Sequence, residues 1–250
     1  MKVIISKEDD FEKSVAEFRK VHQETRNHNE GELWKELTSF MISLNNAFHD
    51  RLVKYKGTKS YDDFFLKISS SLIYARVLDS VKTMQLIGFE IHSGAYRSAI
   101  RNLRFLLESM IHAYYMDKKH PNMDVLDKMS MDEVDKLTRY DLIVVKCGFS
   151  ETVYQFFRDL SQYAHNTKEE RDILANQLID KGTIPMIFRF EESLFKKCVN
   201  LTIDVMDVFV YVVLEIFPEI TGYCKDLILS RTFVKDALGK SALKLTHGRV

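Results

Sequence analysis

Hydrophobic residues recur along almost the whole chain with the spacing of an α-helix. Apolar side chains return every three or four positions, which gives a helix one buried face. Only three prolines and nine scattered glycines interrupt this pattern, so signals that end a helix are sparse. The expected helices cover residues 9–28, 33–57, 61–92, 95–119, 131–146, 150–165, 168–181, 191–217 and 222–244. Residues 183–190 are expected to be extended, but one isolated segment does not make a sheet.

This pattern predicts an all-α protein, an antiparallel up-and-down helical bundle with an additional N-terminal helical hairpin. Residues 1–57 are expected to form the hairpin and to dock on the main domain. Residues 58–250 are expected to form the bundle itself, because no linker or low-complexity tract divides them.

Composition narrows the class of protein. The chain carries 36 basic and 36 acidic residues, and this balance argues against a protein that coats duplex DNA but permits a local basic patch. Three cysteines without paired spacing fit reduced thiols in the cytoplasm, and no metal-binding motif or other cofactor signature is present. The apolar segment 198–217 contains Asp204, Asp207 and Glu215, which would be costly in lipid. We therefore expect a cytoplasmic protein without a membrane partner and without a cofactor.

The segment 150–165 contains the strongest functional signal. Arg158 and His165 are seven positions apart, so on a helix they emerge from one face, two turns apart. The apolar stripe of this helix consists of Val153, Phe156, Phe157, Leu160 and Ala164. A neighbouring stripe of polar and titratable groups consists of Tyr154, Arg158, Ser161 and His165. A cation and an imidazole are thus aligned beside the edge of the core.

A second polar stripe runs along the segment 95–119. Its expected core face consists of Tyr96, Ile100, Leu103, Leu107, Ile111 and Tyr114, and the stripe beside it of Arg97, Arg101, Arg104, Glu108, His112 and Tyr115. Three arginines on one face repel each other unless an acidic residue, a second subunit or a phosphate neutralises them. Glu108, four residues after Arg104, can pair with one arginine. Guanidinium groups suit carboxylate and phosphate equally, so an inert salt-bridged face and an anion-binding face both remain open.

Arg158, the polar Asp159 and His165, with six residues between the arginine and the histidine, resemble the motif of the HEPN superfamily. The residues Tyr154, Leu160, Ser161, Tyr163 and His165 are also similar to a signature of prokaryotic, especially archaeal, helical proteins. In those proteins an earlier helix reads much like Gly94, Tyr96, Ala99, Arg101, Leu103, Arg104 and Glu108 do here. The resemblance covers residues 60–217 and implies a helical bundle that often dimerises. Many such proteins are metal-independent ribonucleases in defence or toxin–antitoxin systems, and others are inactive binding modules.

The chemistry that this resemblance implies is phosphodiester transesterification. The imidazole of His165 would transfer the proton of the ribose 2′-hydroxyl or of the leaving oxygen, and Arg158 would stabilise the developing charge. Two copies of the chain facing across a twofold axis would complete the site. The expected catalytic residues are Arg158 and His165, and the expected binding residues are Arg97, Arg101, Arg104, Glu108, Tyr154, Ser161 and Tyr163. The partners would be a second copy of the chain, single-stranded RNA, or a protein such as an antitoxin.

A non-catalytic helical protein is the alternative. Its arginine-rich face would bind a partner chain or a phosphate-containing ligand. His165 would then cap the end of its helix, and Arg158 would form a salt bridge with a neighbouring helix. We expect Arg97, Arg101 and Arg104 to face the helix that carries Arg158 and His165, or a pocket between the two helices.

Overall fold

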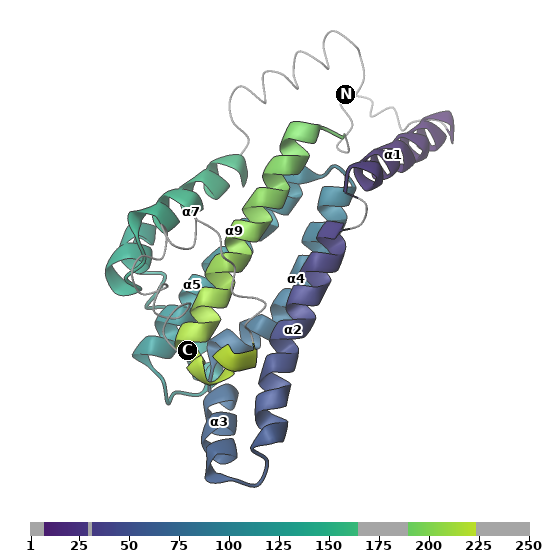
Figure 1. Ribbon diagram of the computed structural model, residues 1–250. Coiled ribbons are helices and arrows are strands. Elements are labelled where there is room, and N and C mark those ends of the chain that lie inside the picture. Colours follow the sequence, from purple (N-terminus) through teal and green to yellow (C-terminus); the bar gives the residue numbers. More distant parts are fainter. Residues whose placement is uncertain (1–7, 30–31, 165–189, 224–250) are drawn as a thin grey trace.

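The computed structural model describes residues 8–29, 32–164 and 190–223 (Figure 1). The longer helices are α1 (Glu8–Asn29), α2 (Glu32–Lys54), α3 (Lys59–Ser69), α4 (Leu72–His92), α5 (Tyr96–Lys119), α7 (Glu151–Ala164) and α9 (Glu192–Ile216). Short helical segments are α6 (Val125–Ser130), the π-helix η1 (Asp141–Lys146) and the 3₁₀-helix η2 (Pro218–Tyr223). The described residues contain no strand, so the prediction of an all-α bundle is confirmed.

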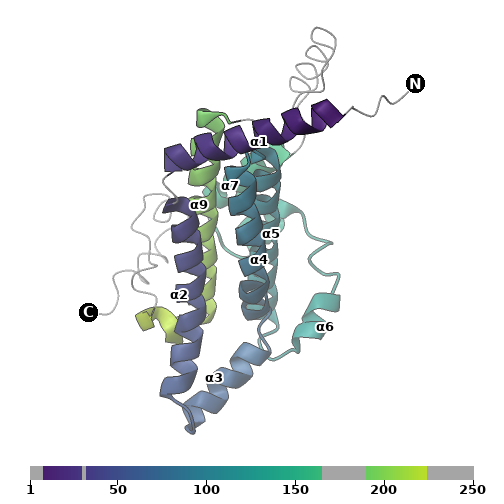
Figure 2. The ribbon, with the colours of Figure 1, turned by 90° about the vertical axis from the view of Figure 1, so that its right-hand side faces the viewer.

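Helix α5 is the central element, because α4, α7, α9 and η1 all pack against it. The six residues of its predicted core stripe, from Tyr96 to Tyr114, are all buried. Figure 2 shows α4 and α5 side by side and antiparallel. The turn that joins them contains Gly94 with φ of 72°, a left-handed conformation that a residue without a Cβ adopts at little cost.

Helix α2 is part of the same core. The Phe48 and Phe217 rings meet edge-on, with their centres 5.0 Å apart. The Phe40 and Phe209 rings also meet edge-on. Helix α1 runs across the end of the bundle at a steep angle to α2 (Figure 2), and its Val21 is buried. Helix α2 is therefore one of the bundle helices, and α1 covers one end of the bundle.

The single helix predicted for residues 61–92 is wrong, because the chain breaks at Ser70 and Ser71. The Ser71 hydroxyl accepts a hydrogen bond from the Tyr74 amide and thereby starts a new helix, α4. Apolar periodicity continues through the break, since Ile68 of α3 and Leu72 of α4 enter the same core. Periodicity alone therefore cannot reveal this boundary.

The helix predicted for residues 131–146 is also wrong. Asp124 caps the short helix α6 by accepting from the Leu126 amide at 2.8 Å, and a turn region follows up to Thr138. Thr138 accepts from the Asp141 amide at 3.1 Å and so starts the separate segment η1. The segments predicted at 168–181, at 183–189 and beyond Tyr223 lie outside the described residues.

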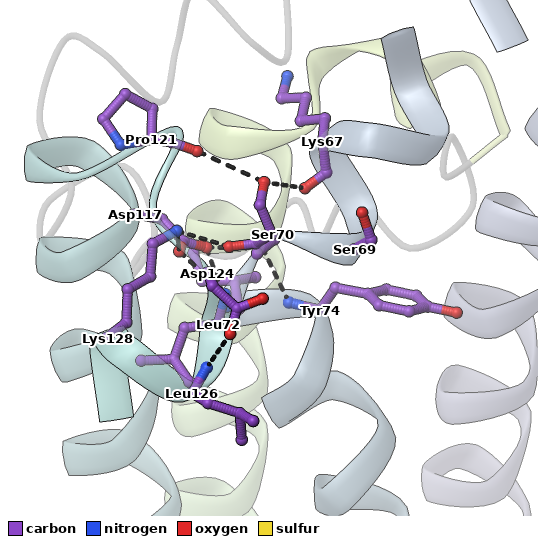
Figure 3. Close-up of polar contacts among 12 residues, drawn as sticks. Lys67, Ser69, Ser70, Leu72, Tyr74, Asp117, Pro121, Asp124, Leu126 and Lys128 are labelled. Carbon is purple, nitrogen blue, oxygen red and sulfur yellow. Dashed lines mark hydrogen bonds and ion pairs between the residues drawn. The ribbon is translucent and has the colours of Figure 1, made fainter. Parts of the chain in front are cut away.

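A buried carboxylate joins three helices at one end of the bundle (Figure 3). Asp117, near the end of α5, accepts from the Ser71 hydroxyl at 2.6 Å and from the amides of Leu72 and Ile73 at 2.9 and 3.0 Å. The Lys128 ammonium of α6 donates to Asp117 at 2.8 Å and to the Ser70 carbonyl at 2.6 Å. The side chains of Lys128 and Asp117 are only 1% and 4% exposed. The carboxylate thus caps α4 and neutralises a buried cation.

Asp117→Ala should lower the free energy of unfolding by about 3–5 kcal/mol, because Lys128 then stays buried without its partner. Urea denaturation followed by circular dichroism measures this loss. The matched control is Asp132→Ala, which breaks an exposed ion pair with Lys136 and should cost less than about 1 kcal/mol. The double variant Asp117→Leu with Lys128→Met should recover much of the lost free energy of unfolding. Similar small losses in Asp117→Ala and in the control Asp132→Ala would contradict a structural role for the buried pair.

Candidate functional site

The polar stripes of α5 and α7 meet at Arg104. Its guanidinium carbon lies 5.5 Å from the centre of the Phe157 ring, which borders the polar stripe of α7. The Glu108 carboxylate, one turn along α5, lies 3.8 Å from a terminal nitrogen of the Arg104 guanidinium. Arg97 and Arg101 are exposed, and Arg101 donates to the Ser98 hydroxyl at 3.3 Å. Of the three predicted arginines, Arg104 is thus the one with a described contact to α7.

Arg158 lies on the exposed side of α7. Its guanidinium carbon is 6.0 Å from the centre of the Tyr154 ring, and the Tyr140 ring meets Tyr154 edge-on at 5.1 Å. The Tyr140 hydroxyl donates to Glu151 at 3.2 Å. Arg158 forms no salt bridge within the described part of the chain, so the salt bridge of the alternative hypothesis is not found there. An exposed cation therefore lies next to the Tyr154 ring, which the Tyr140 ring contacts in turn.

The remaining predicted residues of α7 are described only in part. The Ser161 hydroxyl donates to the Phe157 carbonyl at 2.8 Å, which leaves its lone pairs able to accept from a ligand. Helix α7 ends at Ala164 in the described residues. The Tyr163 side chain and all of His165 lie outside them. The structure thus places Arg158 of the predicted catalytic pair, and the position of His165 stays a prediction.

A group of charged residues, of which the sequence analysis missed Arg76 and Arg139, lies around Glu108 and His112. Glu108 also pairs with Arg139, which precedes η1. The Glu108 side chain is 26% exposed. His112 follows one turn along α5, and the charges of Arg76 on α4 and of Arg139 act on its imidazole. We call Arg76, Arg104, Glu108, His112 and Arg139 the Glu108 cluster. The spacing of Glu108 and His112 was the one signal for it, since Arg76 and Arg139 come from other elements.

Burial makes the Glu108 cluster electrostatically unusual. The pKa of His112 is lowered from its ordinary value of 6.5, first by burial and then by the nearby Arg76 and Arg139 charges. Asp135 and Glu108 act in the opposite direction but do not reverse the shift. Within the Glu108 cluster, three buried nitrogen atoms have no hydrogen-bond partner among the described residues. These are the Nε atoms of Arg76 and Arg104 and the Nε2 atom of His112. At neutral pH the imidazole is therefore uncharged, and the cluster retains unused donors.

Cysteine chemistry is not favoured at the two described thiols. Burial raises the pKa of both Cys147 and Cys198 to about 12, so each thiol is protonated and a poor nucleophile near neutral pH. Among the described residues, no three His, Cys, Asp or Glu side chains are grouped so that they could hold a metal ion.

No protein-family model, curated protein or solved structure matches this chain. None of the described helices combines the length and the apolar character needed to cross a membrane.

The free energy of unfolding should decrease as the pH falls from about 7 to about 5. The pKa of His112 is lower in the folded protein than in the unfolded chain, where it is near 6.5, so the unfolded chain binds more protons below that pH. The pKa of His92 is also lowered, by burial and by His22, so it contributes in the same direction. His112→Gln should therefore give a smaller decrease than the wild type.

Urea denaturation at a series of pH values tests this dependence. The control is His49→Gln, because the His49 side chain is 74% exposed and its loss should leave the pH dependence unchanged. Parallel curves for the wild type and His112→Gln would show that His112 does not titrate differently in the folded protein.

Proposed function

We propose that this protein binds single-stranded RNA through the joined polar faces of α5 and α7. The observation that carries the proposal is the exposed Arg158 beside the Tyr154 ring on α7, next to the arginine stripe of α5, which Arg104 links to α7 through the buried Phe157. Single strands are bound by cations that attract the phosphates and by aromatic rings on which unpaired bases stack. A local patch of this kind is compatible with a net charge of zero.

Each residue of the face has a role in this proposal. Arg158 and Arg104 contact phosphates, and the exposed Arg101 and Arg97 extend the cationic path along α5. Tyr154 offers its ring to a base, with Tyr140 supporting it from the side. An acidic partner chain would also be attracted by the arginines and could pack on the rings, since tyrosine is frequent at protein interfaces. The binding experiment below therefore compares RNA with an acidic peptide.

RNA cleavage is a second candidate function, favoured by the state of Arg158. This arginine is exposed and forms no salt bridge with the described residues, so it is available to a substrate. In the proposed reaction the ribose 2′-oxygen attacks the adjacent phosphorus and the bond from phosphorus to the 5′-oxygen breaks. His165 transfers the protons, and Arg158 stabilises the charge on the phosphoryl oxygens. A homodimer would place two such pairs together, in a defence or toxin–antitoxin context.

Arg158→Ala should weaken binding of a mixed-sequence single-stranded oligoribonucleotide by about tenfold or more, the usual consequence of losing a charged contact. Fluorescence anisotropy at several salt concentrations measures the affinity, and the variant should also show a smaller salt dependence. Tyr154→Leu should weaken binding without changing that salt dependence. The control is Arg19→Ala on α1, an exposed arginine far along the chain from this face. Equal affinities for the wild type and Arg158→Ala would contradict RNA binding by α7, and preference for an acidic peptide would favour the protein partner.

Wild-type protein should cut single-stranded RNA in the presence of EDTA and leave 2′,3′-cyclic phosphate ends, because the internal 2′-hydroxyl is the nucleophile. His165→Ala should abolish cleavage, and Arg158→Lys should lose most of it since an ammonium lacks the paired donors of guanidinium. Mass spectrometry of the products identifies the ends. Undiminished cleavage by His165→Ala would show that the activity comes from another site or a contaminant. RNA binding without cleavage by the wild type would contradict the proposed cleavage and support RNA binding as the function.

A further inference from the structure

The Glu108 cluster contains more positive than negative charge. Two guanidinium groups, those of Arg104 and Arg139, pair with the half-buried Glu108 carboxylate, and a third, that of Arg76, acts on the neighbouring His112. The other nearby carboxylates are on the outside, since Asp135 is exposed and the Asp79 side chain next to Arg76 is 75% exposed. Water screens exposed charges more strongly than half-buried ones. Within the cluster three guanidinium groups thus stand against one carboxylate, and Asp79, which pairs with Arg76 at 3.6 Å, and Asp135 add negative charge only on the exposed side.

Unused hydrogen-bond donors accompany this charge. The Nε atoms of Arg76 and Arg104 are buried without an acceptor among the described residues, and so is Nε2 of His112. A buried donor without an acceptor is costly, and such donors are uncommon unless a ligand, an ion or water satisfies them. The donors come from α4 and from two positions of α5 that lie about two turns apart, with Arg139 approaching from the segment before η1. An acceptor that serves them must therefore offer oxygen atoms in several directions.

We propose that the Glu108 cluster binds a phosphate monoester dianion. Its negative charge is attracted by the guanidinium groups of the cluster, and its tetrahedral oxygens can accept from Arg76, Arg139 and His112 from different sides. A carboxylate ligand would bring one charge and two coplanar oxygens, and it would leave donors unused. The same chemistry is offered by a free monoester such as a mononucleotide and by the 5′-phosphate end of an RNA strand. This site does not depend on RNA binding at Arg158.

Binding of the dianion is coupled to the protonation of His112. A nearby negative charge favours the imidazolium form and so counteracts burial and the charges of Arg76 and Arg139. Glu108 from α5 and Asp135 from the segment after α6 already act in this direction. By linkage, the ligand should raise the pKa of His112 and should itself bind more tightly at a pH where His112 takes up a proton.

Nuclear magnetic resonance of histidine-labelled full-length protein tests the site, with inorganic phosphate, a 5′-mononucleotide, and matched oligoribonucleotides carrying a 5′-phosphate or a 5′-hydroxyl. Inorganic phosphate should raise the pKa of His112, and the resonances of the exposed His49 should not respond to phosphate. Arg76→Lys and Arg139→Lys should each weaken phosphate binding by about tenfold, because an ammonium cannot reproduce the guanidinium fork. Circular dichroism verifies that both variants keep the wild-type helix content.

The oligonucleotides distinguish the two sources of the phosphate. Tighter binding of the 5′-phosphorylated strand, lost in Arg76→Lys, identifies the end of an RNA strand as the ligand. Equal binding of both strands, together with the phosphate effect on His112, identifies a free monoester. Arg158→Ala should weaken binding of the 5′-hydroxyl strand by about tenfold and leave the phosphate effect on His112 intact, which separates this site from the proposed RNA face. An unchanged pKa of His112 with every probe would overturn the proposal.

Discussion

The buried carboxylate of Asp117 sets the position of the helices on which both proposed sites depend. Helices α4 and α5 are joined by the turn at Gly94 at one end, and Asp117 fastens the start of α4 to the end of α5 at the other. An antiparallel helix pair held at both ends cannot slide along its axis without losing one of these connections. The buried Glu90 fits this register, because it accepts from Ser98 and Asn102 on the facing turns of α5. The same register places Arg76 of α4 close to His112 of α5.

Burial increases along the polar stripe of α5 from its first turn to its last. Arg97 and Arg101 are exposed, Arg104, Glu108 and His112 are half-buried, and Tyr115 is buried. The change follows from packing, since α7 and the segment before η1 cover the later turns. Electrostatic interactions strengthen as water is excluded, so an arginine at the buried end of this stripe attracts an anion more strongly than one at the exposed end. Exposed arginines suit an extended, exchangeable polyanion, whereas half-buried ones suit a compact anion held at a fixed position.

The sequence predicted the faces of α5 and α7 because each of these helices buries one stripe, and periodicity reports burial directly. It did not predict the break between α3 and α4. There the hydrogen bonds to Asp117 replace those of a continuous helix while the apolar spacing runs on. It also missed Arg76 and Arg139 as members of the candidate site. Both reach Glu108 or His112 only through tertiary packing, and neither lies on the stripe that contains those residues.

The two proposed sites share a physical connection through Glu108. Its carboxylate pairs with Arg104, which contacts α7, and with Arg139, which belongs to the phosphate site. A dianion next to Arg139 competes with Glu108 for that guanidinium, and a carboxylate released from Arg139 can pair more closely with Arg104. An RNA phosphate that attracts Arg104 has the reverse effect on Arg139. Because coupling between two binding sites is reciprocal, each ligand must alter the affinity for the other by the same factor. Replacing Glu108 by Gln removes the shared charge, so the coupling should disappear in that variant even where both sites still bind.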